Sequence, residues 1–207
     1  MSESMVKSAE SPKGEQLTSL SANAGSATQK YSIVYADPPW EYDSSRSIAQ
    51  KSCLSGDDKT HYNYMSIEKL CALPVNDVCD KNALLFLWTT GPKLNLAFNV
   101  ITSWGFTYST IAFVWEKVNI NPGYYTLSST EICLVAKKGI IPTPRGIRNA
   151  RQFYQEKKER HSKKPIGIRN IITNMFPTQR KIELFAREKA EGWDVWGNEV
   201  ESDIELV

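Results

Sequence analysis

The residues best suited to chemistry are Asp37-Pro38-Pro39-Trp40, which directly follow the apolar run at 33–36. An amine attached to a flat ring is a poor nucleophile, because its lone pair is delocalised into the ring. The Asp37 carboxylate can accept a hydrogen bond from one N–H and the Pro38 carbonyl from the other, and consecutive prolines hold that carbonyl rigidly. We expect an exposed Trp40 that stacks on the ring. The tetrapeptide therefore predicts a pocket that binds a flat, amino-bearing ring. Methylation of such an amine, adenine's for example, would require a methyl donor positioned in line with the nitrogen.

A purely structural interpretation of the same four residues stays open. Asp-Pro is a common way to begin a turn. An aromatic residue after two prolines can also do no more than cover the edge of a core.

The surrounding pattern must place this tetrapeptide at the end of a buried strand. Continuous apolar runs predict strands at 32–36, 83–88, 108–115, 132–135 and 182–186. Helices are expected after the N-cap Ser66, from Pro92 to near Gly105, and from Pro165 to Pro177. Alternating strands and helices favour an α/β fold, a three-layer sandwich around a mostly parallel sheet. Ligands in such folds bind at the carboxyl ends of strands, where the following residues are expected: Asp37, Trp88, Thr89, Trp115 and Arg187.

Length and composition bound the answer further. The 207 residues carry a net charge of +2 and divide into a disordered tail at 1–29, which has no aromatic residue, and one domain at 30–207. We expect no signal peptide and no membrane span. The four cysteines lack metal-ligand or redox spacing, and there are only two histidines, so we expect no metal site. Reduced thiols indicate the cytoplasm or the nucleus.

Six motifs in a fixed order resemble a known family. They are Tyr35–Trp40, Leu85–Gly91, Phe113–Lys117, Glu131–Val135, His161–Pro165 and Lys181–Arg187. Together they resemble the MT-A family of adenine N6-methyltransferases, named after the seventy-kilodalton subunit of the RNA adenosine methyltransferase, over residues 31–200. The resemblance implies a Rossmann-like, S-adenosylmethionine-dependent enzyme of the permuted β-class, in which the amine-binding motif precedes the cofactor motif.

The resemblance also implies roles for individual residues. The catalytic positions are Asp37, Pro38, Pro39 and Trp40, and the cofactor-binding positions are Asp37, Lys164, Glu183, Phe185, Arg187, Asn198 and Glu199. Lys164 is expected at the carboxylate of the cofactor, and Asn198 and Glu199 near its adenine and ribose. Strand alternation places Glu183 on the same face as Phe185. Glu199 replaces an amide found in relatives, and no acidic residue lies at 24–30, so we expect weaker cofactor binding or a partner that completes the pocket.

A basic, aromatic-interleaved segment predicts contact with nucleic acid. The expected nucleic-acid-binding residues are Tyr62, Arg145, Arg148, Arg151, Lys157, Lys158 and Arg160. An ordinary solvated surface is the alternative. The sequence contains no separate reader motif, so we expect low sequence specificity or help from a homo- or heterodimer partner.

The expected function is therefore transfer of a methyl group from S-adenosylmethionine to the N6 amine of adenine, with DNA favoured because compact members of the family resemble bacterial or phage DNA enzymes. Three alternatives remain: an RNA adenine methyltransferase, a non-catalytic subunit that scaffolds a partner and binds nucleic acid, and an enzyme that methylates another planar amine.

Overall fold

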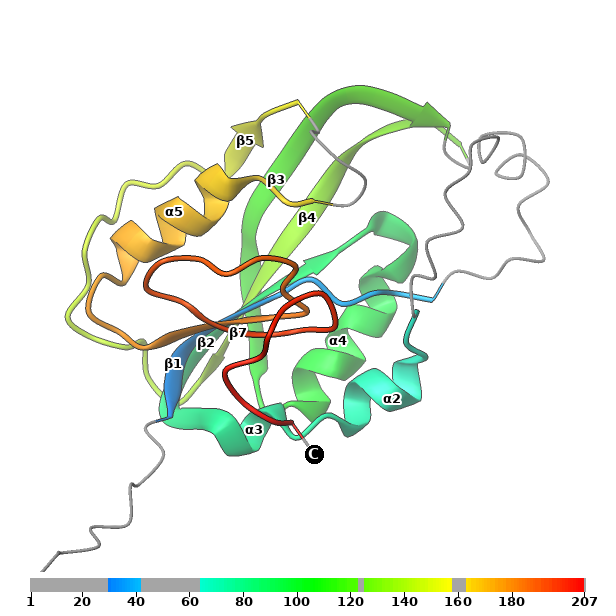
Figure 1. Ribbon diagram of the computed structural model, residues 1–207. Coiled ribbons are helices and arrows are strands. Elements are labelled where there is room, and N and C mark those ends of the chain that lie inside the picture. Colours follow the sequence, from blue (N-terminus) through cyan, green and yellow to red (C-terminus); the bar gives the residue numbers. More distant parts are fainter. Residues whose placement is uncertain (1–29, 42–63, 123–124, 158–162, 207) are drawn as a thin grey trace, which may run out of the picture.

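The computed structural model describes residues 30–41, 64–122, 125–157 and 163–206, and these form an α/β fold around a single sheet (Figure 1). Three of the predictions fall outside the described residues. They are the tail at 1–29, the loop residue Tyr62, and the basic residues Lys158 and Arg160.

Seven strands form a single sheet in the order β5-β3-β4-β2-β1-β6-β7. The strands are β1 (Tyr31–Ala36), β2 (Cys79–Thr89), β3 (Thr107–Pro122), β4 (Leu127–Lys138), β5 (Phe153–Gln155), β6 (Lys181–Leu184) and β7 (Asp194–Trp196). β1 pairs in parallel with β2 and β6, as β6 does with β7 and β3 with β5. β4 alone runs antiparallel to both of its neighbours. The predicted mostly parallel sheet is confirmed.

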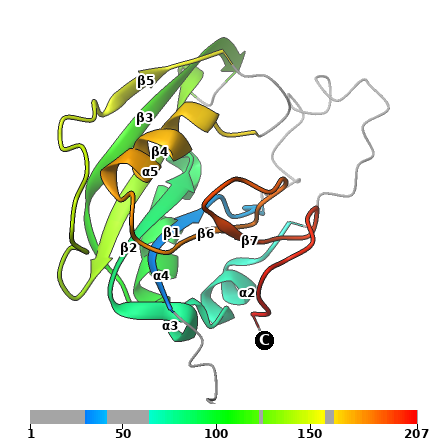
Figure 2. The ribbon, with the colours of Figure 1, turned by 60° about the vertical axis from the view of Figure 1, so that its left-hand side comes forward.

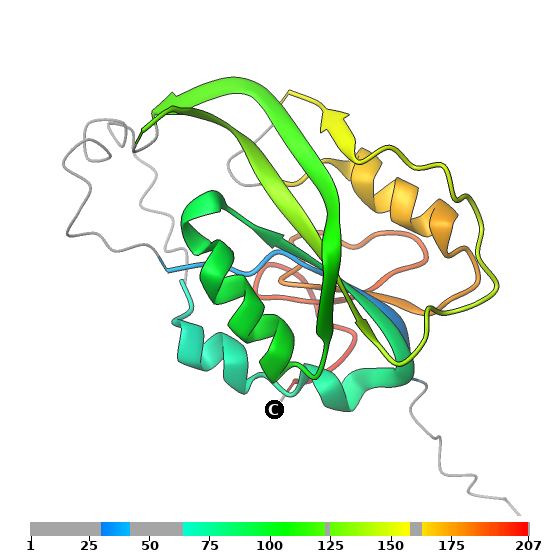
Figure 3. The same cartoon turned by 180° about the vertical axis from the view of Figure 1, so that it is seen from behind.

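Helices cover both faces of this sheet. α2 (Ile67–Ala72), α3 (Val75–Val78) and α4 (Leu94–Ser103) lie on one face, which Figure 3 brings forward, and a single turn of 3-10 helix at Gly91–Lys93 leads into α4. α5 (Ile166–Met175) lies on the other face (Figure 2). The arrangement is the expected three-layer sandwich. No helix in the described ranges is long and apolar enough to cross a membrane.

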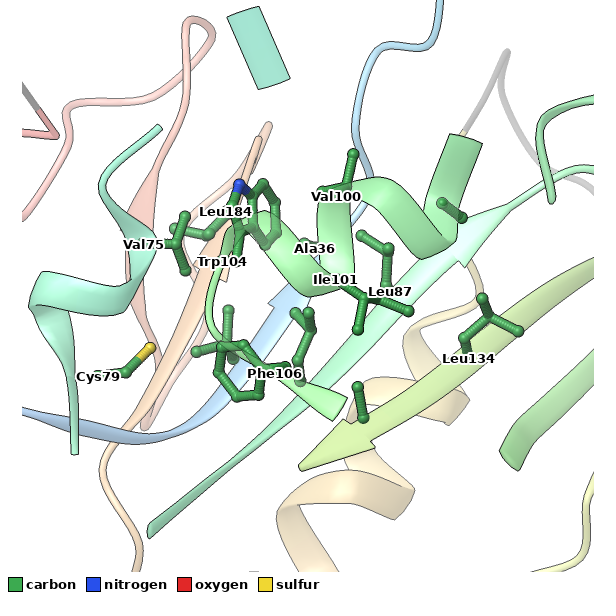
Figure 4. Close-up of a cluster of buried hydrophobic side chains, with 14 of the residues drawn as sticks. Ala36, Val75, Cys79, Leu87, Val100, Ile101, Trp104, Phe106, Leu134 and Leu184 are labelled. Carbon is green, nitrogen blue, oxygen red and sulfur yellow. The ribbon is translucent and has the colours of Figure 1, made fainter. Parts of the chain in front are cut away.

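Strand alternation divides the core between the two faces. On β1, Val34 and Ala36 point to the cluster under α4, whereas Ile33 and Tyr35 point to the cluster under α5. Figure 4 shows the first cluster, in which side chains of α4 pack over the strands. Trp104 is fully buried there, and its indole N–H donates to the Leu70 carbonyl at 2.8 Å, which ties α4 to α2. β1 is therefore fixed from both sides, and so is the loop that follows it.

The helix starts follow the predicted signals. Ser66 is the N-cap of α2, its hydroxyl accepting from the Lys69 backbone N–H at 3.4 Å. Pro165 is the N-cap of α5, which ends two residues before Pro177. The structure adds β5 and β7, which were not predicted, and lengthens β3 and β4 into the long hairpin at the upper right of Figure 1.

Candidate active site

The Asp-Pro-Pro-Trp segment begins where β1 ends, at the carboxyl edge of the sheet. Its backbone is held in place by two hydrogen bonds. The Trp40 N–H donates to the Pro38 carbonyl at 2.9 Å, and the Met65 N–H donates to the Pro39 carbonyl at 2.9 Å. A carbonyl oxygen has two lone pairs, so Pro38 keeps one for a further donor. The segment is thus a rigid turn, in which Pro38 is buried and its carbonyl already accepts one hydrogen bond.

Trp40 is buried, and the expectation of an exposed stacking platform is wrong. The side chain is 6% exposed and packs in the core cluster under α4. Its indole N–H donates to the Trp88 carbonyl at 3.1 Å. After the two prolines the chain turns back onto the sheet, so the ring fastens the turn to the end of β2 instead of facing solvent.

Asp37 heads a chain of four buried or half-buried charges that we call the charge chain: Asp37, Lys164, Glu131 and Lys117. The Lys164 ammonium lies 2.7 Å from the Asp37 carboxylate and 3.1 Å from that of Glu131. The other oxygen of Glu131 lies 3.2 Å from the Lys117 ammonium. The four side chains are only 10–24% exposed and come from the end of β1, the start of α5, β4 and β3. Two acids and two lysines leave no net charge.

The charge chain treats its two acids differently. Burial raises the pKa of Asp37, and Lys164 offsets only part of that rise. Burial also acts on Glu131, but Lys164 and Lys117 together outweigh it and lower the pKa of that carboxyl. The pKa of Lys164 itself is raised, because its two carboxylate partners outweigh burial. Lys164 is thus held as a cation, and Asp37 is the less firmly ionised of the two acids.

Three aromatic rings lie beneath the charge chain. The Lys164 ammonium lies 5.5 Å from the centroid of the Trp88 ring, within reach of a cation–π contact. Trp88 in turn packs edge-on against Trp115 at 6.2 Å and against Tyr35 at 6.4 Å. This low-dielectric floor strengthens electrostatic contacts made above it.

The predicted cofactor residues at the end of β6 and beyond β7 come together. The Ala186 N–H donates to the Trp196 carbonyl at 3.0 Å, and a Cβ at Gly197 would collide with the Ala186 backbone, so the two segments touch. Arg187 approaches Glu199 at 3.7 Å. Phe185 packs edge-on against Trp196 at 5.3 Å.

Glu183 and Phe185 do not share a face, which corrects the expectation from alternation. β6 ends at Leu184, and Phe185 has a φ of 61°, so its ring turns to the cluster under α4. Glu183 points to the opposite side, where its carboxylate lies 2.7 Å from the Arg169 guanidinium of α5. Burial raises the pKa of Glu183. The Glu183 carboxylate is therefore engaged with α5.

The basic segment, residues 139–165, divides into exposed and packed residues. Arg148, Arg151 and Lys157 are exposed. The Arg145 guanidinium instead lies 5.4 Å from the centroid of the Phe176 ring and is half-buried. Phe153 on the edge strand β5 is 59% exposed. The described part of the segment thus presents three cations and one aromatic ring to solvent.

A pocket opens between β5 and the start of α5. Its lining residues are Trp115, Tyr154, Glu156, Lys157, Lys163, Lys164, Pro165, Ile166 and Gly167. The Tyr154 hydroxyl donates to the Glu156 carboxylate at 2.6 Å, and that bond raises the pKa of Tyr154 to about 12. A Cβ at Gly167 would occupy the position of the Tyr154 hydroxyl, so this close approach requires glycine. Lys164 belongs to both the pocket and the charge chain, which places the pocket beside Asp37.

Comparison with known proteins identifies the family. The MT-A70 family model matches residues 31–199. The chain belongs to the MT-A70 family. It is 43% identical over 190 residues to the type II methyltransferase M.MunI of a Mycoplasma species, an alignment that covers 86% of this chain and 82% of M.MunI.

Larger members of the MT-A70 family match over a smaller share of their length. The N(6)-adenosine-methyltransferase MT-A70-like protein of Drosophila melanogaster is 30% identical over 190 residues, and the N(6)-adenosine-methyltransferase catalytic subunit METTL3 of Homo sapiens is 27% identical over 184 residues. The aligned region is 86% and 83% of this chain, respectively, but 28% of each relative. The predicted family is confirmed, and the chain is a methyltransferase of the MT-A70 family.

Two members of the charge chain were not predicted as site residues. Glu131 was visible as an acid at the start of the apolar run in β4, within a family motif. Lys117 closes another motif in β3. Their meeting depends on the β3–β4 register, in which Trp115 stands opposite Glu131. Sequence spacing alone does not contain that register.

Proposed function

We propose that this MT-A70 family chain transfers a methyl group from S-adenosylmethionine to the N6 amine of adenine in nucleic acid, with DNA as the favoured polymer. The observation that carries the proposal is the pair of acceptors at the end of β1. Asp37 offers a part-exposed carboxylate and Pro38 a carbonyl with a free lone pair, on a turn that hydrogen bonds hold rigid. Two acceptors at fixed positions match the two N–H groups of the amine.

These acceptors prepare the amine for attack. Hydrogen bonds from both N–H groups to Asp37 and Pro38 draw the nitrogen toward tetrahedral geometry and make its lone pair available. When bound, S-adenosylmethionine supplies a methyl group activated by a sulfonium sulfur. As the N–C bond forms and the bond from the methyl group to sulfur breaks, positive charge develops on nitrogen, and the Asp37 carboxylate stabilises that charge in a site of low dielectric. Asp37 is also the adjacent base for the proton that the methylated amine releases.

The residues beyond β6 and β7 fit the cofactor by their chemistry. Asn198 offers both a donor and an acceptor to an adenine edge, and the Glu199 carboxylate can accept from ribose hydroxyls. Lys164 has three N–H donors, of which Asp37 and Glu131 take two. One donor remains for the amino-acid carboxylate of the cofactor. We propose Phe185 and Arg187 as further contacts. Glu183 contributes by holding α5 against β6 through Arg169.

The target base would lie between Asp37 and the pocket that starts at Lys164. We propose that Arg148, Arg151 and Lys157 contact phosphates and that the exposed ring of Phe153 stacks on a base. The similarity to M.MunI supports DNA, because it extends over most of both chains and M.MunI is a compact protein of comparable length. The weaker, partial similarity to N(6)-adenosine-methyltransferases supports RNA as the second candidate. METTL3 is named as a subunit, so a partner chain is part of the proposal.

The test measures transfer of a labelled methyl group from S-adenosylmethionine to four oligonucleotides: DNA and RNA, each with and without adenine. We expect labelling of the adenine-containing DNA alone. Labelling of RNA would favour the second candidate. No adenine-dependent labelling of either polymer, with the protein tested alone and with added candidate partners, would contradict the proposed function and favour a non-catalytic subunit.

A further inference from the structure

We propose that Lys117 is a positioning residue that acts through Glu131 to leave Lys164 available to Asp37. This inference rests on the proposed function, in which Asp37 holds the target amine. Among the described residues, Lys117 makes no hydrogen bond or ion pair with Asp37, and its one ion pair there is with Glu131 at 3.2 Å. Its influence on the amine must therefore pass along the charge chain.

The side chain of Lys117 is buried, and the backbone directly after it adopts an unfavourable conformation. The residue is 8% exposed, although it lies in a hairpin whose next residue, Val118, is 50% exposed. Val118 has a φ of 61°, which is a rare conformation for a β-branched residue. The β3–β4 register also shifts just beyond this point, between Glu116 and Asn121. The backbone thus departs from regular strand geometry within β3, immediately after the residue that pairs with Glu131.

A buried lysine needs a reason, because a buried ion pair contributes little to stability compared with apolar side chains of similar size. Glu131 already has a cationic partner in Lys164 at 3.1 Å. Without Lys117, Lys164 alone would face two carboxylates, and these three remaining groups would together carry a net negative charge. With Lys117 present, Glu131 is satisfied from the other side, and Lys164 can approach Asp37 to 2.7 Å.

The sign of the effect follows from the groups that face Asp37. Lys164 and Arg187 favour its ionised form, and Glu131 and Glu183 oppose it. Glu183 is paired with Arg169, whereas burial raises the pKa of both Tyr35 and Cys133 well above their ordinary values and keeps them neutral. Removing Lys117 leaves the charge of Glu131 less compensated and draws Lys164 toward it. Both changes raise the pKa of Asp37.

The test compares single-turnover methyl transfer to the adenine oligonucleotide across a series of pH values, with cofactor and oligonucleotide saturating. In Lys117→Met, the acid limb of the profile should move up by about one pH unit, the lower end of the shift that a nearby charge produces. At pH values on the acid side of the profile, the transfer rate of the variant should therefore be about tenfold lower than that of the unsubstituted protein, and the two rates should converge at higher pH. Lys117→Arg should restore the profile, since it keeps the cation.

Glu131→Gln gives an independent readout with the opposite sign. Loss of that carboxylate frees Lys164 for Asp37, so the acid limb should move to lower pH. In the double variant Lys117→Met, Glu131→Gln, the effect of Lys117 should disappear, because its route to Asp37 has been removed. These variants decide the question even if Lys117→Met alone does not fold.

Lys181→Met is the matched control. Lys181 is also a buried lysine, but its ammonium donates to the carbonyls of Phe176 and Gln179 at 3.1 Å and 2.7 Å, away from the charge chain. We expect it to lower stability without moving the profile. A uniform loss at all pH values in Lys117→Met, or the same shift in Lys181→Met, overturns the inference alone. No transfer by the unsubstituted protein overturns the proposed function as well.

Discussion

Ion clusters lie at both ends of β1, and they differ in burial. At the start of the strand, the Tyr31 hydroxyl donates to Asp194 at 2.6 Å and Arg180 approaches the same carboxylate at 2.7 Å. The side chains of Arg180 and Asp194 are 36% and 34% exposed. At the end of the strand, every member of the charge chain is 24% exposed or less. One strand therefore connects a solvated ion cluster to a desolvated one.

The difference separates a structural role from a chemical one. A part-exposed pair such as Arg180–Asp194 contributes about 0–1 kcal/mol to stability. Here it connects the starts of β1, β6 and β7. Replacing buried ion pairs with apolar side chains of similar volume is often neutral or stabilising, so stability is a weak reason for the charge chain. We interpret the charge chain as a requirement of the proposed methyl-transfer site. There, Asp37 must stay ionised beside a target adenine that is partly shielded from solvent.

The largest expected effect tests whether the two clusters really differ in role. Asp37→Asn removes the charge that stabilises the developing cation, so we expect methyl transfer to fall ~10²–10³-fold, as on loss of one preorganised electrostatic contact. Single-turnover rates measure the change. Asp194→Asn, at the other end of β1, is the matched control and should keep the full rate. Equal losses in the two variants would remove the distinction between the clusters.

A second substitution measures the cost of leaving the charge chain incomplete. Lys164→Met leaves two carboxylates, those of Asp37 and Glu131, with Lys117 as the one remaining lysine of the charge chain. Breaking a buried pair in this way should lower the free energy of unfolding by ~3 kcal/mol. Urea denaturation gives the value. The loss should shrink when Asp37→Asn is added, because the uncompensated charge is then removed. An additive result would show that Lys164 and Asp37 are not energetically coupled.

Trp40→Phe tests the burial of the tetrapeptide's aromatic residue. The variant leaves the Trp88 carbonyl without its donor, which should cost ~1–3 kcal/mol of stability. Because Trp40 faces the core, the KM for the oligonucleotide should change little. A large rise in KM with unchanged stability would instead restore the stacking role that the sequence suggested.

The smallest effect is expected at the solvated cluster. Arg180→Met loses an ion pair and the contact of its guanidinium with the Tyr31 ring, whose centroid lies 4.4 Å away. Stability should fall by no more than ~1 kcal/mol and the transfer rate should be unchanged. Thermal denaturation and the transfer assay measure both. A loss of several kcal/mol would show that this cluster is as important to the fold as the charge chain.

The sequence predicted the layers of the fold because their signals are local. The apolar runs of β1 and β2 and the Ser66 cap of α2 identify those elements without reference to the rest of the chain. β5 escaped prediction because it has three residues, pairs only with the edge of β3 and is mostly exposed. Such a short edge strand is recognised by its backbone pairing with a neighbouring strand, because its own residues carry no apolar pattern.

The site was predicted only as far as single residues reveal it. Asp37 and Lys164 were identified from motifs, and the structure brings them within 2.7 Å. Lys117 and Glu131 depend on strand register, and the burial of Trp40 depends on where the turn places the ring. The backbone at Phe185, just after β6, is left-handed. Phenylalanine rarely adopts that conformation, so the sequence gives no reason to expect it there.

The most direct test of the account identifies the atom that receives the methyl group. After incubation with S-adenosylmethionine, the adenine-containing DNA is digested to nucleosides, which are separated by chromatography against standards methylated at each position and identified by mass spectrometry. We predict N6-methyladenine with the unsubstituted protein and its near-absence with Asp37→Asn. A methyl group on another base or another nitrogen, or undiminished N6-methyladenine with Asp37→Asn, would contradict the assignment of Asp37 and Pro38 as the acceptors of the target amine.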